Sequence, residues 1–413
     1  MMLGIMDYYL IPFGLFLGAK PLEIGLLIAL PNLLAAVSQL LAVKVVRFAG
    51  SRLRFLTRGV ATQAAILIPV AWLALTSLGG RIGILIVLVA MFKILGNLVG
   101  TAWGSLVSDY LPPKKRGHYF GWRSQVVGIA AVVGVGAAGL FLFLMNQINP
   151  ALGFCLLFLW ASLLRFASSF LLSKMADLPL YFEEASEFTF LMFLRRFKES
   201  NFVKFALYVA SVTFAAHLAS PYFSVFMLRD LKFNYLNYMS VHLAAVIMGL
   251  VAFPIWGKHA DLVGNARILK ITSLLIPLIP FLWLVSKSPL YLIGVEIFSG
   301  FVWSGFNLCT TNFIYDAVSP QKRVRCLGYF NLINGTALCT GTFLGGFLAE
   351  RLAPLWGFRL LTLILLSGIL RLAAHFFLSR TFREVRDSAE PVSSKQLFFS
   401  VVGIRPVTGL DPE

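Results

Sequence analysis

The sequence contains few charged residues, and acidic ones are the scarcest. Charged side chains make up only 13% of the 413 residues, whereas 59% are hydrophobic. A soluble domain has no core large enough to bury so many apolar side chains, so the composition excludes a soluble globular protein. The solvent around most of the chain must therefore be lipid.

Cysteine is also scarce, and the motifs of several enzyme classes are missing. The four cysteines show neither paired nor metal-ligand spacing and lie in or beside apolar stretches, which is typical of small apolar side chains. The sequence has no nucleotide-binding P-loop, no HExxH or GxSxG motif and no paired-carboxylate metal motif. We therefore expect no enzyme, no metal site and no cofactor.

Long apolar stretches, by contrast, recur along the whole chain. A helix needs roughly 20 apolar residues to cross the bilayer core. We mark candidate spans at residues 3–18, 22–46, 56–78, 82–108, 120–145, 151–173, 203–227, 236–257, 268–286, 289–316, 327–349 and 358–379. The predicted fold class is an all-α membrane protein with twelve transmembrane helices.

The first span is short and begins almost at Met1, so we expect a few residues upstream of it. It does not resemble a cleavable signal peptide, because no basic segment precedes it and a second span follows directly.

Basic residues are unevenly distributed between alternate loops. Of the 35 Lys and Arg residues, 25 fall on one side, seven on the other and three within the spans. Because cytoplasmic loops carry the excess of Lys and Arg, this count places both termini in the cytoplasm. The formal charge of +17 then reflects topology and attraction to anionic lipid, and not nucleic-acid binding.

The two halves of the sequence are similar to each other. A shift of 207 positions superimposes the segment from Asp109 to Gly139 on the segment from Asp316 to Gly346, with an Asp, a Pro, two basic residues and four glycines matched. Each half has an even number of spans, so the halves are parallel repeats. The predicted domains are 1–174 and 203–380 as six-helix halves, 175–202 as a cytoplasmic amphipathic linker, and 381–413 as a cytoplasmic tail.

One loop carries a family signature. After the eighth span come Gly257, Asp261, Gly264 and Arg267, a glycine followed by an aspartate four residues on, a glycine three later and then a basic residue. This loop resembles the signature of the major facilitator superfamily, and the segments that begin at residues 109 and 316 are also similar to loops of that family.

The resemblance implies a conformational latch as well as the fold. Gly257 would let helices approach, Gly264 would permit a tight turn, and Asp261 would accept hydrogen bonds from a helix N-terminus of the other half, near residues 116–123. The first half has Arg47 where the family usually has Asp, so we expect an asymmetric latch.

The resemblance also implies that spans 1, 4, 7 and 10 line a central cavity. Each carries one titratable residue, respectively Asp7, Lys93, His217 and Glu296. An ionisable side chain at membrane depth costs roughly 3 kcal/mol or more, so each is a functional hypothesis for proton coupling or substrate binding. Asp7 and Lys93 lie at similar depth and could form a pair that changes protonation.

Structural alternatives stay open for all four residues. Asp7 and Lys93 could form a static ion pair, His217 could be satisfied by a neighbouring helix, and Glu296 could be a solvated carboxylate at the cavity mouth. Arg165 and Arg371, which a shift of 206 superimposes, are interpreted as structural.

Uncharged polar residues in the spans could bind a neutral or zwitterionic solute, or could bond between helices. The cavity candidates are Asn32, Gln39, Asn97, Asn307 and Asn312.

These observations predict a secondary active transporter that moves a small organic solute across the cell membrane by alternating access, with proton coupling. The expected partners are the solute, protons and membrane lipid, and the expected state is a monomer. A transport-inactive sensor or interaction protein and a lipid-moving protein on the same fold remain alternatives, and nothing in the sequence selects a substrate.

The topology can be tested with reporter fusions. Reporters fused after Arg196 and after Arg380 should both report the cytoplasm, and one fused after Asn149 should report the outside, because the basic loops lie inside. Reporter activity in intact cells measures this. An outside signal after Arg196 would contradict both the topology and the parallel repeat.

Overall fold

The structure is a computed structural model that describes residues 1–413 except 40, 42–44, 46–47, 178–199, 319 and 386–413. The side chains of residues 108, 113–118, 120 and 320–325 also lie outside the description. Arg47, most of the predicted linker and most of the predicted tail are therefore not among the described residues.

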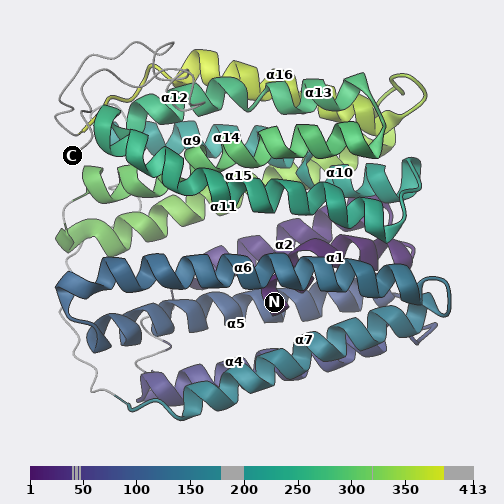
Figure 1. Ribbon diagram of the computed structural model, residues 1–413, viewed down its shortest axis with the longest axis horizontal. Coiled ribbons are helices and arrows are strands. Elements are labelled where there is room, and N and C mark those ends of the chain that lie inside the picture. The colour runs from purple at the N-terminus through teal and green to yellow at the C-terminus, as the bar shows by residue number, and fades with distance from the viewer. Residues whose placement is uncertain (40, 42–44, 46–47, 178–199, 319, 386–413) are drawn as a thin grey trace. The chain divides into compact units, whose positions relative to one another are not determined.

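The described part of the chain consists of long helices (Figure 1). Those of the first half are α1 (Met2–Phe16), α2 (Pro21–Gln39), α4 (Arg52–Trp72), α5 (Arg81–Tyr110), α6 (Pro113–Met145) and α7 (Pro150–Ser173). Those of the second half are α9 (Asn201–His217), α10 (Ser220–Val225), the π-helix η1 (Phe226–Asp230), α11 (Tyr235–Val263), α12 (Asn265–Leu275), α13 (Leu278–Val285), α14 (Pro289–Ala317), α15 (Pro320–Arg351) and α16 (Arg359–Leu378).

These helices confirm the predicted all-α membrane class. Within the described residues, 11 helical segments are long and apolar enough to cross a membrane, and Met2–Phe16 is a shorter apolar helix of 15 residues. Most predicted spans match helices to within a few residues at each end, which is the usual scatter of such boundaries.

Two predicted spans are interrupted, which the apolar pattern did not indicate. The seventh breaks between α9 and α10, and the ninth breaks between α12 and α13. Pro221 is the second residue of α10 and Pro277 immediately precedes α13. A proline lacks the backbone N–H that a continuous helix requires. Pro31 and Pro69, however, lie inside unbroken helices, so proline alone does not determine a break.

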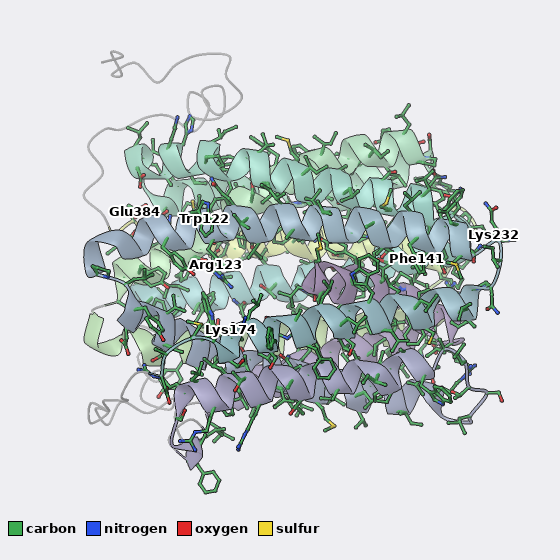
Figure 2. The ribbon with its side chains drawn as sticks, turned by 60° about the horizontal axis from the view of Figure 1, so that its bottom comes forward. Trp122, Arg123, Phe141, Lys174, Lys232 and Glu384 are labelled. Carbon is green, nitrogen blue, oxygen red and sulfur yellow. The ribbon has the colours of Figure 1, made fainter. Side chains whose placement is uncertain are left out.

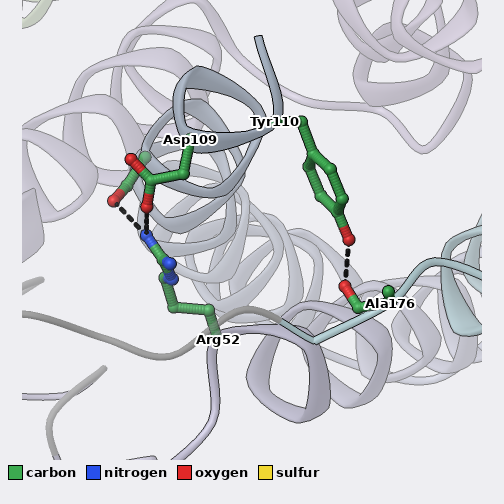
Figure 3. Close-up of polar contacts among 5 residues, drawn as sticks. Arg52, Asp109, Tyr110 and Ala176 are labelled. Atoms are coloured by element: carbon green, nitrogen blue, oxygen red, sulfur yellow. Dashed lines mark hydrogen bonds and ion pairs between the residues drawn. The ribbon is translucent and has the colours of Figure 1, made fainter.

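The same contacts recur in both halves at the end predicted to be cytoplasmic. Arg52 at the start of α4 donates to Asp109 Oδ2 at 2.6 Å, and Tyr110 donates to the carbonyl of Ala176 (Figure 3). In the second half, Asn265 at the start of α12 donates to Asp316 Oδ2 at 2.7 Å. Asp109 and Asp316 are the two aspartates that the sequence repeat superimposes.

Two further acidic residues, Asp177 and Glu384, make similar contacts in the two halves. Ser51 Oγ donates to Asp177 Oδ2 at 2.5 Å, and the backbone N–H of Ala266 donates to Glu384 Oε2 at 2.7 Å. Residues 177 and 384 are separated by the same 207 positions. In each half, a carboxylate that follows the last span therefore binds the N-terminus of the third helix, where the helix dipole favours negative charge.

Contacts divide the chain into two compact units. The first contains Met1–Glu187, His217–Ser240 and Leu338–Leu360, and the second contains Phe188–Ala216, Val241–Ala337 and Leu361–Glu413. The segments of the second sequence half that join the first unit come from the end predicted to lie outside. This grouping differs from the division by repeats, which stays a prediction.

Each unit has its own apolar core. In the first unit, α4, α5 and α7 pack around Leu56, Val60 and Leu106. In the second, Phe205 stacks on Phe313 with ring centroids 4.2 Å apart, and the buried Trp256 joins the same cluster. Offset aromatic pairs of this kind add to the stability that area burial provides.

Glycines allow close packing at the predicted outer end of the first unit. A Cβ on Gly25 of α2 would lie 2.6 Å from the hydroxyl of Tyr222, and a Cβ on Gly346 of α15 would lie 3.0 Å from Leu22 Cα. Tyr222 also donates to the carbonyl of Thr342 at 2.7 Å. Segments from both sequence halves are thus in tight contact at this end.

A larger residue at this contact should separate the segments. Gly346→Leu cannot fit against the backbone of Leu22, whereas Gly294→Leu is a matched control because no atom lies within 4 Å of a Cβ there. In a Thr342→Cys background, Gly346→Leu should increase labelling by a membrane-impermeant maleimide added from outside. Equal labelling in both glycine variants would show that this contact does not close the outer end.

Candidate functional site

The first candidate site is an ion pair between α1 and α5. Lys93 Nζ lies 2.9 Å from Asp7 Oδ1, and the two side chains are 27% and 50% exposed. The sequence predicted that these two residues lie at similar depth in the membrane, and the structure brings them into contact. The contact alone does not assign them a function. Charges about 4 Å apart attract by about 4 kcal/mol at an effective dielectric constant of 20 but by about 1 kcal/mol in water. The strength of the pair therefore depends on whether water reaches it.

Lys93 also lines a cavity inside the first unit. The cavity has a volume of about 440 Å³ and lies among α1, α2, α4, α5, α6 and α7. Its polar and charged lining includes Asn32, Gln63, Lys93, Asn97, Arg123 and Arg165. This volume is in the range of small-molecule sites, which hold an organic solute and not merely an ion.

Two arginines face this cavity from different helices. Arg123 lies on α6 (Figure 2). Its guanidinium lies 4.0 Å from the ring centroid of Trp103. Arg165 on α7 donates from both Nε and a terminal nitrogen to Oε1 of Gln63. Gln63 is buried and in turn donates to the carbonyl of Phe92 at 2.8 Å, so its orientation is fixed.

The polar candidates divide between the units. Asn97 donates across to the carbonyl of Ala35 and Asn32 donates to the carbonyl of Ile28, both at 2.7 Å, and both side chains line the cavity. Gln39 lies half-buried at the end of α2 and does not line it. Asn307 and Asn312 lie on α14 in the second unit.

Glu296 belongs to a separate cluster in the second unit. Trp283 Nε1 donates to Glu296 Oε1 at 3.1 Å, and Arg371 is close enough to interact electrostatically with the same carboxylate. Arg371 is only 3% exposed and donates to Ser367 Oγ at 3.1 Å. Glu296 is thus held by neighbouring helices, in contrast to a freely solvated carboxylate.

Arg371 also binds the interrupted end of α9. Its guanidinium donates to the carbonyl of Ala216 at 3.3 Å, and Ser367 Oγ donates to the carbonyl of Ala215 at 2.6 Å. A helix C-terminus leaves carbonyls without partners and favours a cation. His217, the last residue of α9, therefore lies at a helix end that Arg371 stabilises.

Sequence reasoning missed two residues of the cavity. Gln63 was not singled out, although a glutamine in an otherwise apolar stretch was a usable signal. Arg123 was counted with the basic residues of the predicted cytoplasmic side, although it falls inside the predicted span 120–145, and the structure places it within α6. Its distance from the start of the helix, ten residues after Pro113, was a signal that could have identified Arg123 as a residue within the bundle.

The predicted latch loop is only partly explained. Gly264 has φ +88°, which favours glycine, and the carboxylate of Glu384 occupies the space that a Cβ would need. Gly257 is not tightly packed, because its Cβ would meet Leu308 at an ordinary 3.8 Å. Asp261 is exposed and Arg267 is half-buried, and their predicted role in the other half stays a prediction.

That prediction can be tested on Asp261. If its carboxylate caps a helix of the other half, Asp261→Asn should change the balance of conformations and reduce transport while leaving expression near normal. Cysteine accessibility from both sides of the membrane reads out that balance. Asp230→Asn is a matched control, since Asp230 pairs with its neighbour Arg229 at the predicted outer end. Unchanged accessibility together with normal transport would exclude the latch role.

Comparisons with known proteins agree with this architecture. The model of the Major Facilitator Superfamily matches residues 1–278 and 205–408. No curated protein sequence matches the chain significantly. Many solved structures are similar to the chain, and three of them, all transporters, match over nearly their whole length.

The first is a bacterial homologue of the human lysosomal transporter Spinster in an inward-facing, unoccupied conformation, with 14% identity, 94% of this chain and 95% of that chain covered, and a TM-score of 0.69. The nucleoside transporter NupG has 16% identity, coverage of 91% and 94%, and a TM-score of 0.65. A D-xylose-proton symporter has 11% identity, coverage of 93% for both chains, and a TM-score of 0.71. Identities this low show a shared fold and no shared substrate.

Proposed function

The chain belongs to the major facilitator superfamily, and we propose that it is a secondary active transporter that moves a small organic solute by alternating access and couples this movement to protons. The observation that carries the coupling proposal is the contact between Lys93, in the middle of the long apolar helix α5, and Asp7, on the shorter apolar helix α1. Charges at this depth are costly and are usually functional.

The fold supports the transport part of this proposal. The protein is a multi-pass membrane protein, and its solved neighbours are transporters. The sequence offers no P-loop for nucleotide, so an ion gradient is the remaining source of energy. By the charge count, we place the transporter in the cell membrane with both termini in the cytoplasm.

Packing at the outer end supports alternating access. Segments from both sequence halves meet in the first unit, where Gly25 and Gly346 allow backbones to approach closely. Small residues permit helices to pack without interlocking long side chains, so such a contact can form and separate. A transporter that alternates needs a contact of this kind at one end in each state.

The ion pair has the properties of a proton-coupling site. A carboxylate beside an ammonium ion remains ionised, and a carboxylate that loses this partner in a poorly hydrated site holds a proton more tightly. Separation of Lys93 from Asp7 would therefore load a proton, and their reunion would release it. A transport-inactive sensor or a lipid-moving protein would not need this exchange.

Mutation of the pair should separate coupling from transport. Asp7→Asn should abolish solute accumulation driven by a pH gradient, yet downhill exchange of the solute should continue, since exchange requires no net proton movement. Lys93→Ala should shift the pH dependence of uptake to higher pH, because Asp7 holds its proton more tightly without the ammonium ion. Uptake and counterflow in proteoliposomes measure both effects.

Glu23→Gln is a control that removes a carboxylate at the predicted outer end, where Glu23 accepts a hydrogen bond from the Lys20 backbone. A static ion pair predicts a different result, in which both single variants fold poorly and the double variant Asp7→Asn with Lys93→Met recovers gradient-driven uptake. That recovery would contradict the coupling role.

A further inference from the structure

The cavity of the first unit carries an excess of positive charge. Lys93, Arg123 and Arg165 line it from three different helices, and no Asp or Glu is among its lining residues in the part of the chain that the structure describes. The remaining polar lining from α2 and α4 is uncharged, being Asn32 and Gln63. The charge therefore converges on one cavity and is not spread over a surface.

Only one of these cations has a carboxylate partner among the described residues. Lys93 pairs with Asp7 of α1, whereas Arg165 binds the neutral amide of Gln63 and Arg123 lies over the ring of Trp103. The elements packed against α1 add no acidic group to the cavity. Within the described part of the chain, two positive charges thus remain without a counter-charge.

Uncompensated charges inside a bilayer are unfavourable, and a bound anion would offset them. We propose that this cavity binds the anionic group of the transported solute, so that the cargo is a small organic anion with a carboxylate or phosphate group. This inference rests on the proposed function and specifies its substrate class. Planar guanidinium groups match such oxyanions with paired hydrogen bonds, which favours Arg123 and Arg165 as the contacts.

The other lining residues fit the organic part of such a solute. The indole of Trp103 forms an aromatic wall, and Asn32 and Asn97 each use one amide hydrogen for a backbone carbonyl and retain a second. A cavity of about 440 Å³ is much larger than an inorganic ion requires. The site therefore suits an anion with a polar or aromatic body.

Anion binding would also explain how the cargo is coupled to protons. A carboxylate or phosphate that enters beside Lys93 competes with Asp7 for the ammonium ion. If the site then closes to water, Asp7 without its partner would be more stable protonated, with the proton drawn from the bulk solution. One anion and one proton would consequently bind together and be released together.

The sign of the cavity charge can be measured without knowing the solute. Ser168 lines the cavity, so Ser168→Cys reports on it. We expect this thiol to react faster with the anionic 2-sulfonatoethyl methanethiosulfonate than with the cationic 2-(trimethylammonium)ethyl reagent, after subtraction of the signal of the parent protein. The ratio of rates should fall about tenfold in Arg123→Gln and in Lys93→Met, since each removes a nearby charge.

Lys174→Gln is the matched control. This lysine follows α7, lies over the ring of Phe170 and does not line the cavity, so its loss should leave the ratio unchanged. Two charge-removing variants guard against misfolding of either one. A ratio of rates near one in the Ser168→Cys protein would overturn the inference, whatever the solute is. A ratio that falls as much in Lys174→Gln as in Arg123→Gln and Lys93→Met would also overturn it.

Transport of matched solutes then distinguishes this inference from the proposed function. Counterflow compares each of two anionic solutes with a neutral analogue: benzoate with benzamide, and glucose 6-phosphate with glucose. Inorganic phosphate serves as an anion that has no organic part. We expect counterflow only of the charged organic solutes, and we expect Arg123→Gln to abolish it. Counterflow of a neutral member that persists in Arg123→Gln would overturn the inference while leaving a transporter. Protection of the Ser168→Cys thiol by an anion that is never transported would overturn the proposed function instead.

Discussion

A charge inside a bilayer must find a partner, and the structure is organised around this requirement. Water is absent from the hydrocarbon core, so an isolated ion there is costly. The buried Arg371 meets the requirement permanently, with Ser367, the carbonyl of Ala216 and the nearby Glu296 around it. Lys93 meets it through one contact with a half-exposed carboxylate, which a competing ligand can replace.

The charged residues of the two compact units differ in the same way. In the second unit, helices hold the charged cluster from several sides and fix the end of α9 at the point where the seventh span is interrupted. In the first unit, cations face an open cavity, and two of them have no carboxylate partner among the residues that the structure describes. The cluster around Arg371 stabilises a helix end, whereas the proposal assigns the cations around the cavity to a ligand. The proposal therefore gives the repeat-related Arg165 and Arg371 different roles.

Much of the fold could be predicted because it follows from periodic and local properties. Apolar length gave the helices, and matched positions such as Asp109 and Asp316 anticipated the repeated contacts at one end. Depth along a helix, at 1.5 Å per residue, was enough to suggest that Asp7 and Lys93 meet. Each of these inferences requires only sequence position and regular helix geometry.

The cavity could not be predicted in the same way, because it depends on how several helices face one another. Gln63 is an uncharged residue whose importance comes from its contact with Arg165, 102 positions away. The break before Pro221 was also missed, since Pro31 lies in an unbroken helix, and the carbonyls at the break accept hydrogen bonds from Ser367 and Arg371 of α16, far away in the sequence. Side-chain orientation and long-range packing determine these features.

Proton uptake on solute binding tests the central claim most directly. The purified protein, in weakly buffered detergent solution with a pH indicator, is mixed with the solute that counterflow identifies. The account predicts uptake of about one proton per bound solute, because Asp7 loses its ammonium partner, and no uptake in Asp7→Asn at the same occupancy. Solute binding to the native protein without proton uptake would contradict it.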